Sequence, residues 1–328
     1  MPLRKDPLPR TAGIMTFARA RHGTLDDLKP GMVGVAGVPY DFSGPSRLGA
    51  KFGPWRLRET SNAQGTQAYG NSGTFDIDTR KDVDAAVLHG RLIDLGDITI
   101  YPIEWDQSEE TLREATYQIA KRGATPIILG GDHHITYSLV QGFKNAVIEG
   151  GGKKVGYIQF SSQLDLGDED HVWGRIWRGA TSRRIIDGGM ADTSNMVWVG
   201  TNGYVRSEQW ELARELGLNV FTLDDIRRDG IAAVTQRAIE IAGADCDAIY
   251  LSVDFDVLDG GYVAQTSTPA FDGLTNVDLT TAVDVLAKSK VGAMDLCGLN
   301  PFIESQAQGE TGQRFGALTV LRFIYPRI

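Results

Sequence analysis

Two aspartates separated by one residue follow an apolar run, and their spacing suits metal or proton chemistry. The run 248–251 (Ala-Ile-Tyr-Leu) is typical of a buried strand and leads into Ser252-Val253-Asp254-Phe255-Asp256. Residues two apart on an extended chain point to the same face, so the two carboxylates lie side by side. Adjacent carboxylates repel each other, and a metal ion or a proton normally lies between them. A solvated acidic loop is an equally good interpretation of this stretch alone.

Polar side chains also follow two other predicted strands. His133 comes after the apolar run 125–129, and Asp165 comes shortly after the run 155–160. In a parallel sheet, ligands bind at the carboxyl ends of the strands, so these residues should meet the aspartate pair. A lone histidine is more often structural than a ligand. Beside Asp165, Asp254 and Asp256, His133 completes a plausible set of ligands for a divalent transition ion.

The elements that must position these residues alternate regularly along the chain. Apolar strands alternate with amphipathic helices, which predicts a parallel sheet covered on both faces. The predicted strands are 32–38, 91–95, 125–129, 155–160, 196–199, 220–223, 248–253 and 291–296. The predicted helices are 54–59, 108–121, 135–145, 177–187, 207–216, 231–242, 276–288 and 312–324. We therefore expect one three-layer α/β domain over 31–328 with roughly eight strands, preceded by an N-terminal arm over 1–30, and we interpret the polar stretch 61–90 as a surface insertion.

Charge and cysteine content exclude several classes of function. The formal net charge is -9 and no block of basic residues occurs, which argues against nucleic acid or an anionic membrane as partner. The two cysteines cannot form a disulfide framework, and the N-terminus has no apolar segment typical of a signal peptide. We therefore expect a cytoplasmic protein.

Several motifs, spread over nearly the whole chain, resemble those of the ureohydrolase family of arginases and agmatinases. They are Gly37-Val38-Pro39-Tyr40-Asp41, Gly49-Ala50-Lys51-Phe52-Gly53-Pro54, Asp94-Leu95-Gly96-Asp97, Gly130-Gly131-Asp132-His133, Ser252-Val253-Asp254-Phe255-Asp256-Val257-Leu258-Asp259 and Asn300-Pro301. The resemblance implies the arginase-like fold. It also implies a pair of metal ions, usually manganese, which activate water to release urea from a guanidino group.

Position by position, the same resemblance implies an incomplete site. Four of six metal-ligand positions are retained, namely His133, Asp165, Asp254 and Asp256. Ser161 replaces the aspartate that bridges both metals, and Gln163 replaces a ligand histidine. Arg178 and Gly298 stand where related enzymes have a proton-transferring histidine and a guanidinium-binding glutamate. One metal position would keep His133, Asp165 and Asp254, while the other would keep only Asp254 and Asp256.

We therefore expect no metal in this chain, or one weakly bound divalent ion. The carboxylates left without a metal should recruit protons, a monovalent cation, water or a basic side chain.

Three functional hypotheses remain open. The chain is a non-catalytic subunit that assembles with a homologous active ureohydrolase, which binds manganese or nickel, in a trimer- or hexamer-like hetero-oligomer. Alternatively, it is an active agmatinase-like hydrolase in which the acidic run 168–171 supplies replacement ligands, although a solvated loop is the simpler interpretation of that run. A third hypothesis is a protein that binds a small molecule without turnover. Urea release by the chain alone distinguishes the second hypothesis from the others.

Overall fold

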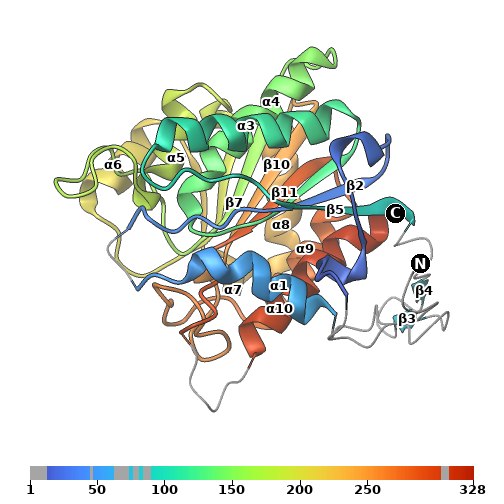
Figure 1. Cartoon of the computed structure of the whole chain (residues 1–328). Coiled ribbons are helices and arrows are strands. Elements are labelled where there is room, and N and C mark those ends of the chain that lie inside the picture. The colour runs from blue at the N-terminus through green and yellow to red at the C-terminus, as the bar shows by residue number, and fades with distance from the viewer. Residues whose placement is uncertain (1–12, 45–46, 63–73, 77–80, 84–89, 304–309) are drawn as a thin grey trace, which may run out of the picture.

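Nine parallel strands form the central sheet (Figure 1). The computed structural model describes residues 13–44, 47–62, 74–76, 81–83, 90–303 and 310–328. Across the sheet the order is β1 (Arg21–His22), β5 (Leu92–Asp97), β2 (Val33–Gly37), β6 (Thr125–Leu129), β11 (Val291–Cys297), β10 (Ala248–Asp254), β7 (Val155–Phe160), β8 (Met196–Thr201) and β9 (Asn219–Thr222). The predicted parallel α/β fold is thereby confirmed.

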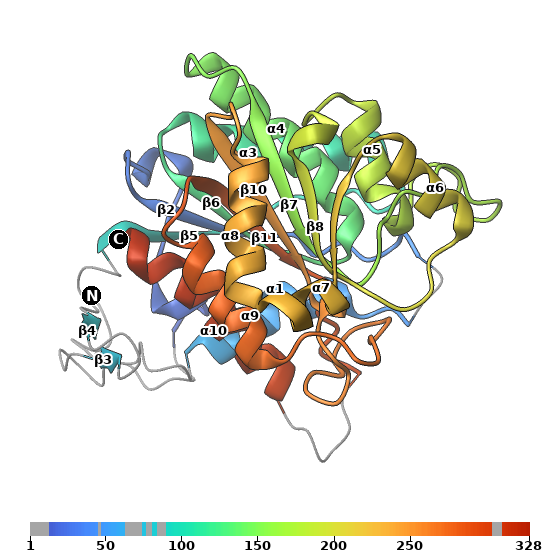
Figure 2. The ribbon, with the colours of Figure 1, turned by 180° about the vertical axis from the view of Figure 1, so that it is seen from behind.

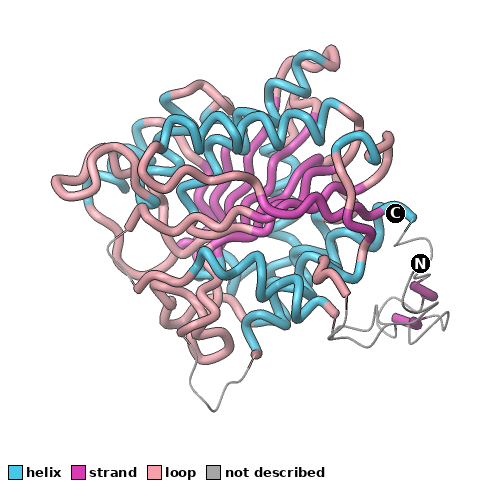
Figure 3. Tube along the Cα trace, in the orientation of Figure 1, coloured by secondary structure: helices cyan, strands magenta, loops and turns pink. Residues whose placement is uncertain are grey.

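Helices cover both faces of this sheet, as the views from the front and from behind show (Figures 1 and 2). One face carries α3 (Trp105–Lys121), α4 (Thr136–Glu149), α5 (Thr181–Asp187) and α6 (Ser207–Glu215). The other carries α1 (Gly53–Ser61), α7 (Leu223–Asp229), α8 (Ile231–Ala242), α9 (Asn276–Leu286) and α10 (Thr311–Ile324). The strands therefore lie between two helical layers (Figure 3), and every residue of β2, β7 and β8 is buried. Within the described residues, no helix combines the length and apolar content needed to cross a membrane.

The structure contains elements that the sequence pattern did not predict. The short edge strand β1 lies within the predicted arm and pairs with β5. Helix α7 begins immediately after β9, where Thr222 and Asp225 form a reciprocal capping box.

The predicted helix 177–187 is instead a turn of 3-10 helix, Arg178–Ala180, followed by α5. Most of the polar stretch 61–90 lies outside the described residues, apart from a small antiparallel pair, β3 (Thr74–Asp76) and β4 (Lys81–Val83).

A buried ion pair fastens the N-terminal segment to the sheet. The guanidinium of Arg58 donates to both carboxylate oxygens of Asp94, at 2.8 and 3.1 Å. Asp94 also accepts the backbone N–H of Phe17 at 2.7 Å, and the Phe17 side chain is fully buried. One carboxylate thus connects α1, β5 and the segment before β1.

Breaking this pair should destabilise the fold. Arg58→Ala leaves the buried Asp94 carboxylate without its counter-ion, and we expect a loss of about 3–5 kcal/mol of unfolding free energy in urea denaturation. Arg113→Ala, which removes a partly exposed i,i+3 pair with Glu110, should cost less than about 1 kcal/mol. Equal losses for the two variants would contradict a structural role for the Arg58–Asp94 pair.

Candidate functional site

Four neighbouring strands of the sheet, β6, β11, β10 and β7, end at the candidate site. Short 3-10 turns follow two of them. Asp132 caps the turn His133–Ile135 by accepting the backbone N–H of His134 at 3.0 Å. Asp254 caps the turn Phe255–Val257 by accepting the N–H of Asp256 at 2.9 Å. These turns hold His133 and the aspartate pair at the carboxyl ends of their strands, as the sequence predicted.

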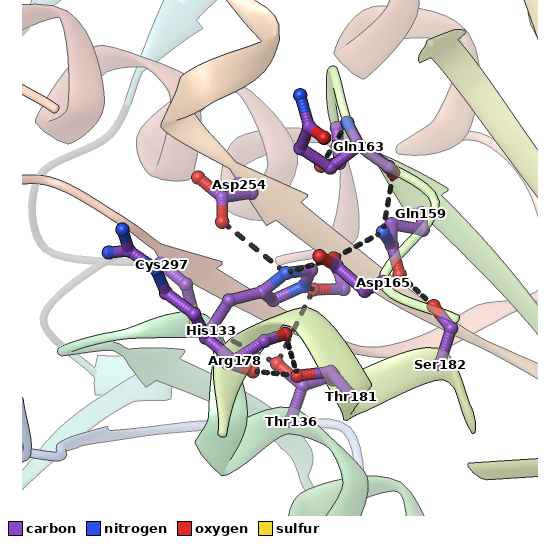
Figure 4. Close-up of polar contacts among 12 residues, drawn as sticks. His133, Thr136, Gln159, Gln163, Asp165, Arg178, Thr181, Ser182, Asp254 and Cys297 are labelled. Carbon is purple, nitrogen blue, oxygen red and sulfur yellow. Dashed lines mark hydrogen bonds and ion pairs between the residues drawn. The ribbon is translucent and has the colours of Figure 1, made fainter. Parts of the chain in front are cut away.

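The imidazole of His133 lies between two carboxylates (Figure 4). Its Nδ1 is 3.0 Å from Asp165 Oδ2 and 3.3 Å from Asp254 Oδ2. Its Nε2 is 3.0 Å from the hydroxyl of Ser252, which itself donates to Asp295 Oδ1 at 2.7 Å. Both ring nitrogens therefore face acceptors, and a doubly protonated ring satisfies all of them.

Electrostatics favours the same protonation state of His133. Burial opposes the charge, but the hydrogen bond with Asp165 and the charges of Asp254, Asp165 and Asp295 outweigh it and raise the pKa of His133 to about 10. The imidazolium thus supplies positive charge among the buried carboxylates.

Asp256 is occupied by hydrogen-bond donors from the loop after β7. Its Oδ1 accepts the Ser161 hydroxyl and the Ser162 N–H, each at 3.0 Å, and its Oδ2 accepts the Ser162 hydroxyl at 2.9 Å. Burial and the charges of Asp254 and Asp165 raise the pKa of Asp256 to about 8, against the effect of these hydrogen bonds. Ser161, at the position where the resemblance implies a bridging carboxylate, thus binds Asp256 as a neutral donor.

The neighbouring position, Gln163, does not enter the carboxylate cluster. Its side chain is exposed, and its Nε2 donates to the Ser162 hydroxyl at 3.4 Å. Asp165, which adopts a left-handed backbone conformation (φ 52°), instead accepts an N–H of Gln159 at 3.0 Å. A glutamine amide from β7 therefore takes one of the contacts to Asp165.

Arg178 brings a second cation into the same region. Arg178 lines the same cavity as His133 and Asp254, and its backbone N–H donates to Ser43 O at 3.0 Å. Burial and the charge of Asp41 raise the pKa of Asp132 to about 6, and the positive charge of Arg178 opposes that shift. Burial raises the pKa of Asp254, and this rise is opposed first by the charge of His133, then by the backbone N–H of Asp256, and least by the charge of Arg178.

Position 298, which is occupied by glycine, has no room for a side chain. Its φ is +77°, and a Cβ placed there would lie 2.2 Å from Asp254 Oδ1. Its N–H donates to Gly131 O at 2.9 Å, which fixes the loop after β11 against the loop after β6. The backbone at 298 thus occupies the space beside Asp254.

The donors present do not fit a pair of divalent ions. A metal bound to His133, Asp165 and Asp254 together would replace the proton at Nδ1, because that atom faces both carboxylates. At the second position, Asp256 has both oxygens engaged by serine donors, and no carboxylate stands at 161 to bridge. Across the described ranges, no group of three or more His, Cys, Asp or Glu side chains is arranged to hold a metal ion.

The acidic run 168–171 makes its contacts elsewhere. Asp168 pairs with Arg175 at 2.8 Å and with Arg184 at 2.5 Å. Asp170 accepts the backbone N–H groups of Val172 and Trp173, and the side chain of His171 is 91% exposed. These contacts show that the acidic residues of this run stabilise the loop and its packing on α5.

The structure brings the eight predicted site positions to one rim, and it adds residues that sequence reasoning left without a role. Asp132 and Ser252 were part of recognised motifs, but only the structure shows that these two residues and Asp295 orient His133 and its loop. Gln159 lies inside an apolar strand and donates to Asp165. A polar side chain within that apolar run was the signal that could have indicated this contact. Thr266, Ser267 and Thr268 also line the cavity.

Comparison with known proteins identifies the family. The model of the arginase family matches residues 32–323. This chain belongs to the arginase family. It is 28% identical to guanidinopropionase of Pseudomonas aeruginosa over 302 residues, which cover 92% of this chain and 88% of that protein. It is 30% identical to the mitochondrial guanidino acid hydrolase of Homo sapiens over 240 residues, which cover 73% of this chain and 63% of that protein.

Solved structures agree with the arginase-family fold. Proclavaminate amidino hydrolase from Streptomyces clavuligerus superimposes with a TM-score of 0.80 at 25% identity, covering 98% of this chain and 99% of that one. The formiminoglutamase of Trypanosoma cruzi, solved with Mn²⁺, gives a TM-score of 0.77 at 22% identity over 94% of this chain and 96% of that one. The second likeness concerns the fold alone.

A side chain at position 298 should be poorly tolerated. In Gly298→Ala the new Cβ meets Asp254 in a left-handed backbone, so we expect a loss of more than about 2 kcal/mol of unfolding free energy. Gly217→Ala is the matched control, because Gly217 also has a positive φ (+63°) but open space around its Cβ position, and it should cost only about 1 kcal/mol. If the two variants lose the same unfolding free energy in denaturant melts, Asp254 does not crowd position 298.

Proposed function

We propose that this chain is a non-catalytic subunit of a heteromeric ureohydrolase, in which a homologous active subunit performs the urea-releasing hydrolysis. The observation that carries this proposal is the contact between Ser161 and Asp256. A neutral hydroxyl donates to Asp256 Oδ1 at 3.0 Å, where the family resemblance implies a carboxylate shared by two metal ions. A serine hydroxyl carries no charge to hold two divalent ions together.

Two further substitutions support the loss of the reaction. Related enzymes, by resemblance, use a glutamate at the position of Gly298 to hold the substrate guanidinium, and glycine provides no carboxylate for that pair. Arg178 places a guanidinium in the same cavity, where it repels a cationic substrate. Metal bridging, metal ligation, proton transfer and substrate binding are thus all altered, whereas the sheet and both helical layers are intact.

The expected partner is a member of the same family that retains the full ligand set and binds manganese or nickel. The similar proteins named above are hydrolases such as guanidinopropionase, so a partner of this kind would act on a guanidino or biguanide-type compound. The pattern of losses resembles the ligand-deficient subunit of metformin hydrolase, which pairs with a metal-binding subunit. The alternative, an active enzyme with a rearranged site, is less well supported because Asp168 pairs with Arg184 of α5 and Asp170 is engaged within its own loop.

Purified alone, the chain should release no urea from agmatine, arginine, guanidinobutyrate or a biguanide. The reason is that no hydroxide can be activated between two metals when the bridging carboxylate is missing. A colorimetric urea assay with added Mn²⁺ or Ni²⁺ measures this, and an active agmatinase run in parallel provides the positive control. Urea production above the protein-free background would contradict the proposal.

Co-expression with a homologous active subunit should yield a stable mixed oligomer. Size-exclusion chromatography coupled to native mass spectrometry should detect both chains in one particle at micromolar concentration. Separate elution of the two chains would refute the subunit assignment, and a distant arginase-family enzyme serves as the control for non-specific association.

A further inference from the structure

Exposed apolar side chains gather at one end of the sheet. Large apolar residues lie exposed in the segments that lead from the carboxyl end of a strand to the next helix, namely Phe42, Leu48, Phe52, Tyr101, Ile103, Val172, Tyr204, Tyr262, Phe271 and Phe302. Among the described residues that lead from a helix back to a strand of this sheet, no large apolar side chain is exposed. Because the strands run parallel, these residues share one end of the molecule. Exposed apolar surface of this kind marks a site of interaction.

Two loops that are far apart in sequence build an aromatic patch within this surface. The rings of Phe52, after β2, and Phe302, after β11, meet edge to face with their centroids 4.8 Å apart. Trp55 lies three residues beyond Phe52 at the start of α1, so the two side chains lie on the same side of the helix. The aromatic patch consists of Phe42, Lys51, Phe52, Trp55 and Phe302, and its four rings are between 38% and 62% exposed.

Contacts with buried residues hold the rings of the aromatic patch in place. Phe42 packs edge-on against the ring of the buried Tyr40, with their centroids 5.6 Å apart. The backbone N–H of Phe302 donates to Oδ1 of the fully buried Asn300 at 3.1 Å. Side chains that are ordered before binding lose little conformational entropy when a partner covers them. The aromatic patch is therefore prepared for a contact that buries it.

The ammonium of Lys51 lies over this patch without a counter-ion. It is 5.1 Å from the centroid of the Phe42 ring and 5.7 Å from that of the Phe52 ring. In the part of the chain that the structure describes, no carboxylate pairs with this ammonium. Removing an unpaired charge from water is costly. A partner that buries the aromatic patch must therefore bring a carboxylate to Lys51.

Charge argues against a second copy of this chain as that partner. In a two-fold symmetric contact, the same patch faces itself. Such a contact would bring two Lys51 ammonium groups together and supply no carboxylate, because the aromatic patch contains none. Glu59 and Glu310, on and beside the neighbouring helices, both pair with Arg56. A different chain, with an acidic residue in an apolar surface, fits the patch better.

We propose that the aromatic patch is the surface by which this chain docks onto the homologous active subunit, with a carboxylate of that subunit paired to Lys51. This inference rests on the proposed function, which supplies the partner. A non-catalytic chain needs no open path for substrate to the carboxyl ends of its strands, so this end of the molecule is free to be covered.

Carbodiimide cross-linking of the mixed oligomer tests the pairing, because this reagent joins an amine only to a carboxylate in contact with it. The oligomer contains this chain and the homologue that retains all six ligand positions and is encoded nearest to its gene. Peptide mass spectrometry should find Lys51 joined to an aspartate or glutamate of the homologue. Lys51 left unlinked, or joined only to another copy of this chain, would overturn the proposal.

Three variants locate the docking surface. Phe302→Ser removes a ring of the patch and should weaken the mixed oligomer about tenfold or more, as loss of a central aromatic residue does in other interfaces. Lys51→Glu reverses the charge that faces the partner and should weaken it as well, and this covers the case in which Phe302→Ser folds poorly. Ile148→Ser is the matched control, because Ile148 is an exposed apolar residue in the last turn of α4, at the opposite end of the sheet. It should assemble like the unmodified chain.

Dilution series followed by native mass spectrometry measure the affinity of each variant and separate this inference from the proposed function. A mixed oligomer that persists undiminished in both patch variants overturns the docking surface and leaves the non-catalytic assignment in place. Urea release by the chain alone removes the non-catalytic assignment itself. If the unmodified chain forms no mixed oligomer, both proposals fail.

Discussion

Buried carboxylates need compensating positive charge, and the rim of this sheet is organised by that constraint. Asp165, Asp254 and Asp256 are each less than a tenth exposed and lie within one cluster. In a medium that solvates charge poorly, such groups are stable only with cations, protons or hydrogen-bond donors beside them. Here the His133 imidazolium lies between Asp165 and Asp254, and two serines from the loop after β7 engage Asp256.

Within this cluster, side chains of the chain itself supply hydrogen-bond donors and positive charge to the buried carboxylates. The Nε2 atom of His133 contacts the hydroxyl of Ser252, which fixes the ring. This hydroxyl donates to Asp295. The fully buried Asp295 carboxylate also accepts hydrogen bonds from the hydroxyls of Thr136 and Tyr250. A metal ion would have to displace the Nδ1 proton and compete with donors that are already in place. At position 161, where the family resemblance implies a bridging carboxylate, the Ser161 hydroxyl belongs to a hydrogen-bonded arrangement that engages Asp256.

The strands and helices with the strongest apolar patterns were predicted to the residue. The runs 125–129 and 155–160 and the helix 231–242 match β6, β7 and α8 because apolar patterns and glycine or polar residues mark both ends. Strand β1 was missed because two exposed residues, Arg21 and His22, form no apolar pattern and depend on pairing with β5. Helix α7 was missed because no loop separates it from β9, and its signal is the capping box alone.

The site was predictable only in its composition. Motif positions indicated which side chains come together, because each follows a predicted strand. The partners of Asp256 and the left-handed backbone of Gly298 depend on loops that are far apart in sequence, so no local pattern encodes them. The packing of the loop after β7 against β10 and α5 likewise decides that Gln163 is exposed and that Gln159 donates to Asp165.

The metal content of the chain tests the central claim most directly. The chain is equilibrated with excess Mn²⁺ at neutral pH, freed of unbound ions by gel filtration and analysed by inductively coupled plasma mass spectrometry. Because His133 and the serine donors already satisfy the carboxylates, fewer than one tightly bound ion per chain is expected. Two ions per chain would contradict the account.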